Sequence, residues 1–143
     1  MMKPSAYRFL SWTWGLPMTL VGCMTALCLF LMGYHPGKWG GTTYFVVEKV
    51  WGGISLGPVT LVSRPDERLL THEFGHSVQN CRWGFLYPPV ILLPSALRFW
   101  YRKAVLRFGR RGGELPGYYD IWFEAGADWL GREAMERWGR TSL

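Results

Sequence analysis

Five consecutive residues, His72 to His76, carry the strongest signal for chemistry in this chain, in the order His-Glu-Phe-Gly-His. Residues four apart lie on one face of an α-helix, so His72 and His76 can present two imidazoles to one metal ion. Zn²⁺ binds imidazole nitrogen at about 2.0–2.1 Å in a tetrahedral shell, and a catalytic shell leaves one position open for water. Glu73 stands next to the first histidine, where its carboxylate can accept a proton from that water.

A third ligand is needed, and Glu124 with Asp128 supplies a candidate pair one helical turn apart. We expect Glu124 to be the third ligand. Asp128 can accept a hydrogen bond from the free ring nitrogen of a liganding histidine, which fixes the tautomer of that ring. Two histidines and one glutamate form an open, catalytic type of zinc shell. The alternative is a chance match in which Glu124 and Asp128 lie on a solvated helix face; the paired motifs favour Zn²⁺.

Both motifs lie in segments with helix signals. Ser63 offers an N-cap and Pro65 an early proline, and Gly84 offers a stop, so we expect a helix over about 64–83. A second helix is expected over about 120–138, where apolar residues recur at helical spacing.

The composition and one long uncharged segment also predict a membrane-spanning helix. The chain has 143 residues, 49% of them hydrophobic, and no charged residue lies between Phe9 and Tyr34. A run of about 20 apolar residues crosses a hydrocarbon core of about 30 Å, so we expect a transmembrane segment at about 14–33. A signal peptide is the rival interpretation. No small-x-small cleavage site follows the run cleanly, which favours a retained anchor.

A second apolar stretch, about 84–101, contains Pro88, Pro89 and Pro94. It is short for a spanning helix, and its prolines disrupt regular helix, so we expect a re-entrant or interfacial segment. An ordinary buried core segment is the alternative. In either case the stretch joins the two halves of the metal site.

Residues 42–63 are rich in β-branched and aromatic side chains. Thr43–Val47 and Val59–Val62 predict two strands of a β-hairpin, with a turn at Trp51-Gly52-Gly53. An exposed edge strand beside the metal helix could bind an extended peptide through main-chain hydrogen bonds. A hairpin with no substrate role is an equal alternative.

The formal net charge is +6, and six of the basic residues crowd into one segment. They are Arg98, Arg102, Lys103, Arg107, Arg110 and Arg111. Aromatic and aliphatic residues interleave with them, which suits a surface facing anionic lipid headgroups. A solvated basic helix is the bland alternative. Nucleic-acid binding is disfavoured because no recognised nucleic-acid module surrounds the segment.

The His72–His76 motif and the E-x-x-A-D form at Glu124–Asp128 together resemble the membrane-embedded gluzincins. Those include prenyl-protein (CAAX) peptidases and the heat-shock membrane protease, and small uncharacterised bacterial membrane proteins share the site. The resemblance implies a zinc peptidase of a bacterial inner (cytoplasmic) membrane, with a peptide or membrane protein as substrate. His72, His76 and Glu124 would be its ligands and Glu73 its general base. The chain departs from the larger families in lacking their several spanning helices.

Taken together, these features predict an α+β membrane protein that is mainly helical. Tyr118 and Tyr119 precede the second helix and are candidate donors to the oxyanion that peptide hydrolysis forms, with aromatic packing as the alternative role. Two other functions remain open: an inactive, zinc-stabilised membrane scaffold, and a basic membrane-surface binding module. A scaffold needs no base, so the presence of Glu73 favours an enzyme.

Overall fold

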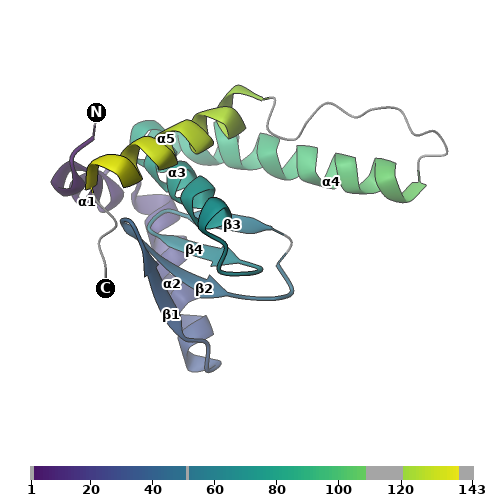
Figure 1. Cartoon of the computed structure of the whole chain (residues 1–143), viewed down its shortest axis with the longest axis horizontal. Helices are drawn as coiled ribbons and strands as arrows, with labels where there is room; N and C mark the ends of the chain where they lie inside the picture. The colour runs from purple at the N-terminus through teal and green to yellow at the C-terminus, as the bar shows by residue number, and fades with distance from the viewer. Residues whose placement is uncertain (1, 51, 109–120, 139–143) are drawn as a thin grey trace.

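The computed structural model describes residues 2–50, 52–108 and 121–138, and its elements stack in layers (Figure 1). A β-sheet is covered on one face by α2 (Leu16–Leu31) and on the other by α3 (Glu67–Trp83). Helix α5 (Trp122–Trp138) packs against α3 on the side away from the sheet. The described elements therefore form a small α+β fold in which α3 is the central helix.

The sheet contains four strands within the described part of the chain. They are β1 (Pro36–Trp39), β2 (Thr42–Val46), β3 (Gly53–Leu56) and β4 (Val59–Val62). Their order across the sheet is β1-β2-β4-β3. The pairs β1–β2 and β3–β4 are antiparallel, whereas β2 and β4 run parallel. Strand β3 therefore lies at an edge of the sheet, next to α3.

The predicted hairpin between residues 43–47 and 59–62 is wrong. Those two segments pair in parallel, with Thr43 opposite Val59, so no hairpin can join them. Two other hairpins form instead, and Gly40 (φ 55°) and Gly57 (φ 63°) make their turns. A positive φ suits glycine, and the proline after Gly57 suits a turn. Residues 53–56 form a strand, and Trp51 of the predicted turn lies outside the described residues.

Helix α3 begins three residues later than predicted because Asp66, not Ser63, caps it. The Asp66 side chain accepts a hydrogen bond from the Leu69 backbone N–H at 3.0 Å. Such a bond satisfies one of the amides that a helix start leaves without a partner. The helix ends at Trp83, where Gly84 takes a φ of 53°, as the glycine stop predicted.

Helices α3 and α5 approach closely because glycines lie at their contact. A Cβ on Gly75 would overlap the Ala127 carbonyl of α5, and a Cβ on Gly131 would overlap the Thr71 carbonyl of α3. Because neither glycine has a side chain, the two helix backbones can come into contact, as they do at other close crossings that contain small residues. The second helix forms at Trp122–Trp138, close to the expected range of about 120–138. Its crossing with α3 brings its acidic residues to His72 and His76.

The predicted transmembrane helix, and with it the membrane fold class, is wrong. The helix expected at 14–33 forms as α2, but no single helix of the described residues is long and apolar enough to cross a membrane. Helix α1 (Pro4–Ser11) and α2 meet that test only as a pair, bent by 85°. The uncharged run therefore contains a sharp break. One side of α2, with Met18, Thr19 and Gly22, is buried in the fold.

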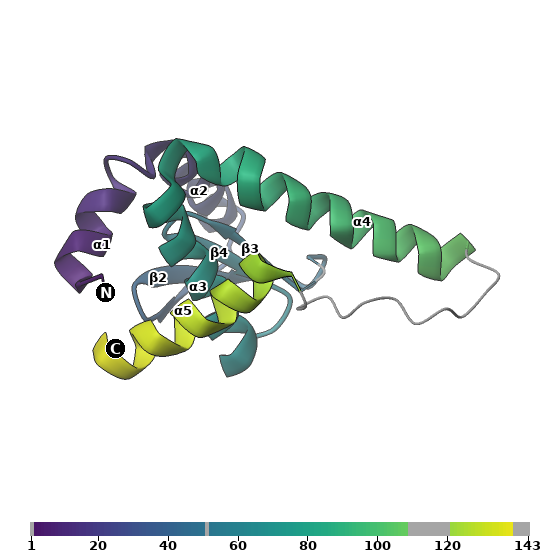
Figure 2. The ribbon, with the colours of Figure 1, turned by 90° about the horizontal axis from the view of Figure 1, so that it is seen from above.

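The proline-rich stretch is partly core, as its alternative interpretation held. A 3₁₀ turn (Gly84–Leu86) and a π-helical turn (Pro88–Leu92) lead into helix α4 (Leu93–Phe108). Proline is tolerated in a first helical turn, so these prolines do not interrupt the path. Tyr87 and Ile91 pack with Met18 and Phe123 in a buried cluster. Beyond them, α4 extends away from the rest of the described structure (Figures 1 and 2).

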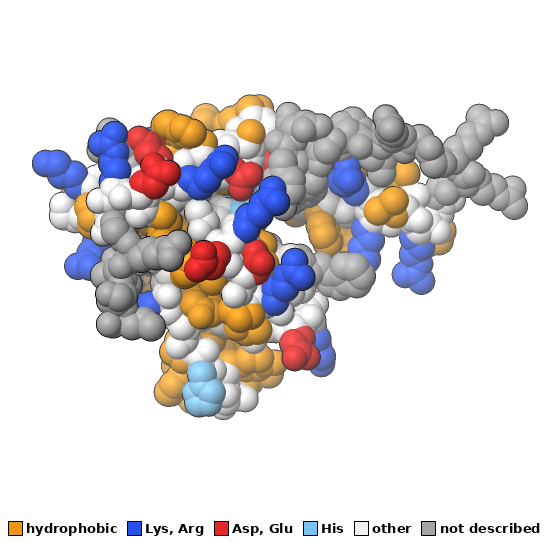
Figure 3. All heavy atoms as spheres, in the orientation of Figure 1, with side chains coloured by type: hydrophobic (Ala, Val, Ile, Leu, Met, Phe, Trp, Pro, Cys, Tyr) orange, Lys and Arg blue, Asp and Glu red, His pale blue; other side chains and the backbone are white. Residues whose placement is uncertain are grey.

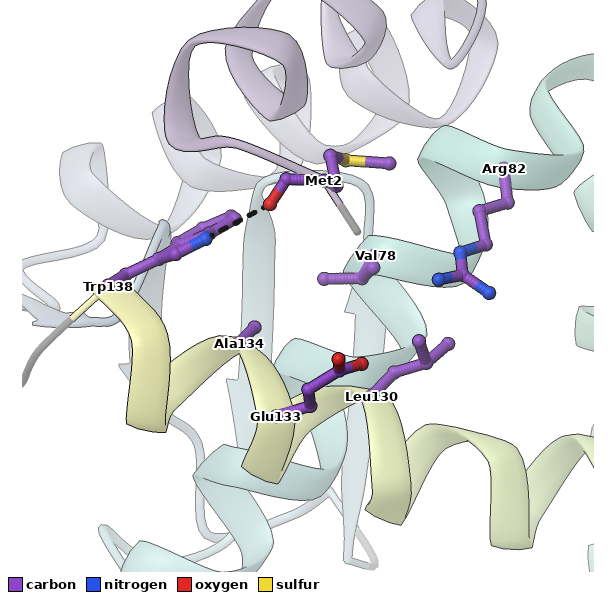
Figure 4. Close-up of a pocket in the computed structure, with 7 residues that line it drawn as sticks. All are labelled: Met2, Val78, Arg82, Leu130, Glu133, Ala134 and Trp138. Atoms are coloured by element: carbon purple, nitrogen blue, oxygen red, sulfur yellow. Dashed lines mark hydrogen bonds between the residues drawn. The ribbon is translucent and has the colours of Figure 1, made fainter.

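The end of α5 is tied to the start of the chain (Figure 4). The Trp138 indole donates a hydrogen bond to the Met2 carbonyl at 3.2 Å, and its ring packs edge-on against Tyr7 and Phe74. The hollow between Met2, Val78 and Trp138 measures only about 10 Å³. That is room for about one water molecule. This end of the molecule therefore stabilises the helix crossing and has no room for a substrate.

The helix crossing gives a first test. Replacing Gly75 with Ala places a methyl group against the Ala127 carbonyl, and backbone cannot give way as a side chain can. We expect Gly75→Ala to lower the free energy of unfolding by about 3 kcal/mol or more, as severe overpacking does. Urea denaturation followed by circular dichroism measures it.

Gly126→Ala is the matched control on α5, because a Cβ there meets only the end of the Gln79 side chain, at 3.2 Å. That variant should stay within about 1 kcal/mol of the parent, the helix-propensity difference between Gly and Ala. Equal stability of the two variants would show that the crossing does not depend on Gly75.

Candidate metal centre

His72, His76 and Glu124 bring three potential ligand atoms together, and all three side chains are buried. Glu124 Oε2 lies 3.2 Å from His72 Nε2 and 3.3 Å from His76 Nε2. Ligand atoms held about 2.1 Å from a tetrahedral ion are about 3.4 Å from one another. The observed separations match that spacing, so this group can hold a metal ion.

The second ring nitrogen of His72 is held by α5. His72 Nδ1–H donates to Asp128 Oδ1 over 2.7 Å. A carboxylate accepts this bond, so His72 Nδ1 carries a proton and Nε2 is the ring nitrogen that faces Glu124. The structure thus places Asp128 where it orients a ligand without belonging to the ligand group, a position that raises the basicity of the imidazole.

His76 has a comparable support that the motif analysis missed. Its Nδ1–H donates to Gln79 Oε1 at 2.8 Å, and the Gln79 amide donates to the Phe123 carbonyl at 2.6 Å. The Phe123 carbonyl therefore sets the orientation of the Gln79 amide, which in turn sets the tautomer of His76. Gln79 lies three residues after His76 on the same helix, so this spacing was a usable signal.

Glu124 is oriented from a different direction. Ser95, at the start of α4, donates a hydrogen bond from Oγ to Glu124 Oε1 at 2.6 Å. That bond occupies one carboxylate oxygen and leaves Oε2 facing the two imidazoles. Ser95 lies 29 positions from Glu124 in an apolar stretch, and no spacing rule indicates it.

Glu73 is buried, yet it does not belong to the ligand group. Its carboxylate packs against Gly53 of the edge strand β3, where a Cβ would collide with Glu73 Oε1 and lie 2.6 Å from Cδ. A glycine at position 53 therefore makes the space in which this carboxylate sits. Gly53 is a third residue, after Gln79 and Ser95, that sequence analysis did not assign to the site.

The charges around the site favour a cation between the imidazoles. Burial alone would lower the pKa of His72, but Glu124, Glu73 and Asp128 raise it to about 9. Burial would raise the pKa of Glu124, but its hydrogen bonds with His72 and His76 hold it below the usual range. These carboxylates stabilise positive charge at this point, whether on a ring proton or on a metal ion. The donor set and its surroundings thus fit a bound metal.

The pKa of Glu73 is raised in turn, chiefly because burial disfavours its charged form, and the two histidines oppose that effect. Tyr87 also lies near these charges. Burial, together with Glu73 and Glu124, raises the pKa of its phenol well above the ordinary value. Tyr87 therefore stays protonated and remains a hydrogen-bond donor. Tyr118 and Tyr119, the predicted oxyanion donors, lie outside the described residues.

An open cavity of about 420 Å³ adjoins the site. His72 and Asp128 line one side of it. The remaining lining residues come from the loop before β3, the loop between β4 and α3, and the start of α3: Gly52, Ser63, Arg64, Asp66, Arg68 and Leu69. Basic and acidic side chains lie next to one another on the face shown in Figure 3. Because the cavity is open, solvent or a short segment of a larger molecule can reach the edge of the metal site.

Comparison with protein-family models, curated proteins and solved structures finds no match for this chain. The resemblance to gluzincins thus rests on the two motifs, His72–His76 and Glu124–Asp128. Function is therefore argued from the geometry of the site.

The ligand assignment predicts one metal ion per chain. Glu124→Gln should lose most of it, because an amide supplies no negative charge between the imidazoles. Glu133→Gln is the matched control: Glu133 is on the same helix and lines the small hollow of Figure 4. Elemental analysis of purified protein gives the metal content. Equal metal in both variants would remove Glu124 from the ligand set.

The hydrogen bond to His76 gives a separate prediction. Gln79→Ala should keep the site but weaken metal affinity by about 10–100-fold, the usual effect of removing the residue that orients a ligand. Competition with a chelator of known affinity measures the change. An unchanged affinity would mean that Gln79 does not orient His76.

Proposed function

We propose that this protein is a zinc-dependent peptidase in which Glu73 is the general base. The observation that supports this most directly is the separation of roles at the site. Three buried side chains converge on one point, while a fourth, Glu73, is close enough to interact with both histidines but is not a ligand. Three protein ligands leave a fourth tetrahedral position for water, which distinguishes catalytic zinc sites from structural ones.

Zinc is the proposed metal because two imidazole nitrogens and one carboxylate oxygen suit it. When bound, Zn²⁺ would lower the pKa of its water to about 7 and polarise the scissile carbonyl. Asp128 and Gln79 hold the Nδ1 atoms of His72 and His76, so Nε2 of each ring is the atom that would bind the metal. The chain thus orients both imidazoles before any ligand arrives.

Glu73 handles the proton in this mechanism. Its buried carboxylate has a raised pKa, which makes it a better proton acceptor near neutral pH than an exposed glutamate. It would take a proton from the attacking water and return it to the leaving amine. Tyr87, whose protonated phenol lies near Glu73 and Glu124, is a candidate hydrogen-bond donor at the site.

A polypeptide substrate is supported by the edge strand. Within the described sheet, β3 is an edge strand that pairs with β4 and has no strand on its other side. Gly53, the first residue of that strand, lies against Glu73. An extended peptide added along β3 would therefore run past the general base. This placement favours peptide hydrolysis over other metal-assisted hydrolyses.

Glu73→Gln separates an enzyme from a zinc-stabilised scaffold. Glutamine keeps the size and polarity of the side chain, so zinc content and fold should be retained. It cannot accept the proton of the attacking water. Hydrolysis of a peptide substrate should fall by about 10²–10⁴-fold, the usual contribution of general-base catalysis. Cleavage at the parent rate, with zinc still bound, would favour the scaffold.

Gly53 should matter through Glu73. A methyl group at position 53 would collide with the Glu73 carboxylate and displace it. We expect Gly53→Ala to lower kcat by about tenfold or more while zinc content stays unchanged, because a small misplacement of a catalytic group is costly. Ile54→Ala, at an exposed position on the same strand, is the control. If both variants lose activity equally, the effect belongs to the strand and not to Glu73.

A further inference from the structure

Helix α4 presents an apolar stripe that no described residue covers. No residue of α4 is buried. The stripe consists of Leu93, Leu97, Trp100, Tyr101 and Phe108, whose exposed fractions are 54%, 61%, 62%, 63% and 78%. Their spacing of three, four or seven residues puts them on one face of the helix. Large exposed apolar patches are uncommon on proteins that have no binding partner there.

The direction of this stripe follows from Ser95. Ser95 points to Glu124 and so faces α5, and by helical spacing the stripe lies on nearly the opposite side of α4. Figures 1 and 2 place α2 and α4 on the side of the molecule away from α5. The outer face of α2 is also apolar and exposed. Its most exposed residues are Leu20, Met24, Leu27, Phe30 and Leu31, between 51% and 76%.

Charge decides what fits this surface. The described helix α4 carries Arg98, Arg102, Lys103 and Arg107 and no acidic residue. By helical spacing, Lys103 and Arg107 lie along one border of the stripe. Two copies of this face would bring like charges together, which disfavours self-association. A surface that combines anionic groups with an apolar layer would complement both the Lys and Arg side chains and the apolar stripe. Trp and Tyr side chains are suited to the boundary between such layers.

We propose that the outer faces of α2 and α4 form a docking surface for an anionic lipid bilayer. The contact is peripheral: α4 lies in the plane of the headgroups, and its apolar stripe enters the boundary with the acyl chains. The metal site would then be held beside the bilayer by Ser95, which links α4 to Glu124. Because the surface does not include the ligands, the proposal is independent of peptidase activity.

Co-sedimentation of the full chain with vesicles tests it. We expect binding to vesicles of phosphatidylglycerol and phosphatidylcholine in equal parts, at least about tenfold weaker binding to phosphatidylcholine alone, and weakening by added salt. Trp100→Ala should reduce binding to the anionic vesicles by about tenfold, since burying one large apolar side chain has that effect.

Trp129→Ala is the matched control, because Trp129 is 56% exposed but belongs to α5. It should bind as the parent does, and both variants should keep their thermal stability and metal content. Three outcomes would overturn the proposal. They are no binding to either vesicle, equal binding to both, and a dimer that Trp100→Ala converts to a monomer. The last would show that a second copy of the chain covers the stripe.

Discussion

The close crossing of α3 and α5 is the constraint on which the rest of the structure depends. Gly75 and Gly131 let the two helix backbones meet, since either Cβ would strike a carbonyl of the other helix. Only at that separation does the Glu124 carboxylate come within 3.2–3.3 Å of both imidazoles. Gly75, the fourth residue of the His72–His76 motif, therefore sets the distance between the two helices, whereas its neighbours supply the chemical groups of the site.

The remaining layers hold this crossing and supply the groups around it. The sheet supports α3 on its inner side and presents Gly53 to Glu73. The α4 segment contributes Ser95 to Glu124, and Tyr87 just before it joins the buried cluster. Gln79, which orients His76, is itself held by the Phe123 carbonyl of α5. The carboxyl groups of Glu73 and Glu124 are buried, and burying such groups is tolerable only where charge partners and hydrogen bonds compensate.

Local signals were sufficient for what lies within one helix. The His72–His76 spacing, the Glu124–Asp128 spacing and the Gly84 stop all depend on helical periodicity, and the structure contains both helices. Gln79 was within reach of the same reasoning. Ser95, Gly53 and Tyr87 were not, because the fold brings them from other elements and no spacing indicates that. Ser95 belongs to the site through a hydrogen bond, Gly53 through its lack of a side chain, and Tyr87 through its burial near the charged groups.

The errors have a common cause. Apolar composition favours a membrane span, but it does not show where a helix bends. The break between Ser11 and Leu16 divides the uncharged run between two helices. One side of α2 is buried against the sheet. Strand pairing failed for a similar reason, since the glycines at both ends of β3 favour turns and no local pattern indicates a strand between them. Without it, β2 and β4 look like neighbours in a hairpin.

X-ray absorption at the zinc edge of the purified full chain tests the metal assignment most directly. If His72, His76 and Glu124 bind zinc, the first shell should contain four light N or O atoms at about 2.0–2.2 Å, with the outer-shell scattering of two imidazole rings. A shell that contains sulfur, a six-coordinate oxygen shell without imidazole, or the absence of any bound metal would contradict the proposed centre.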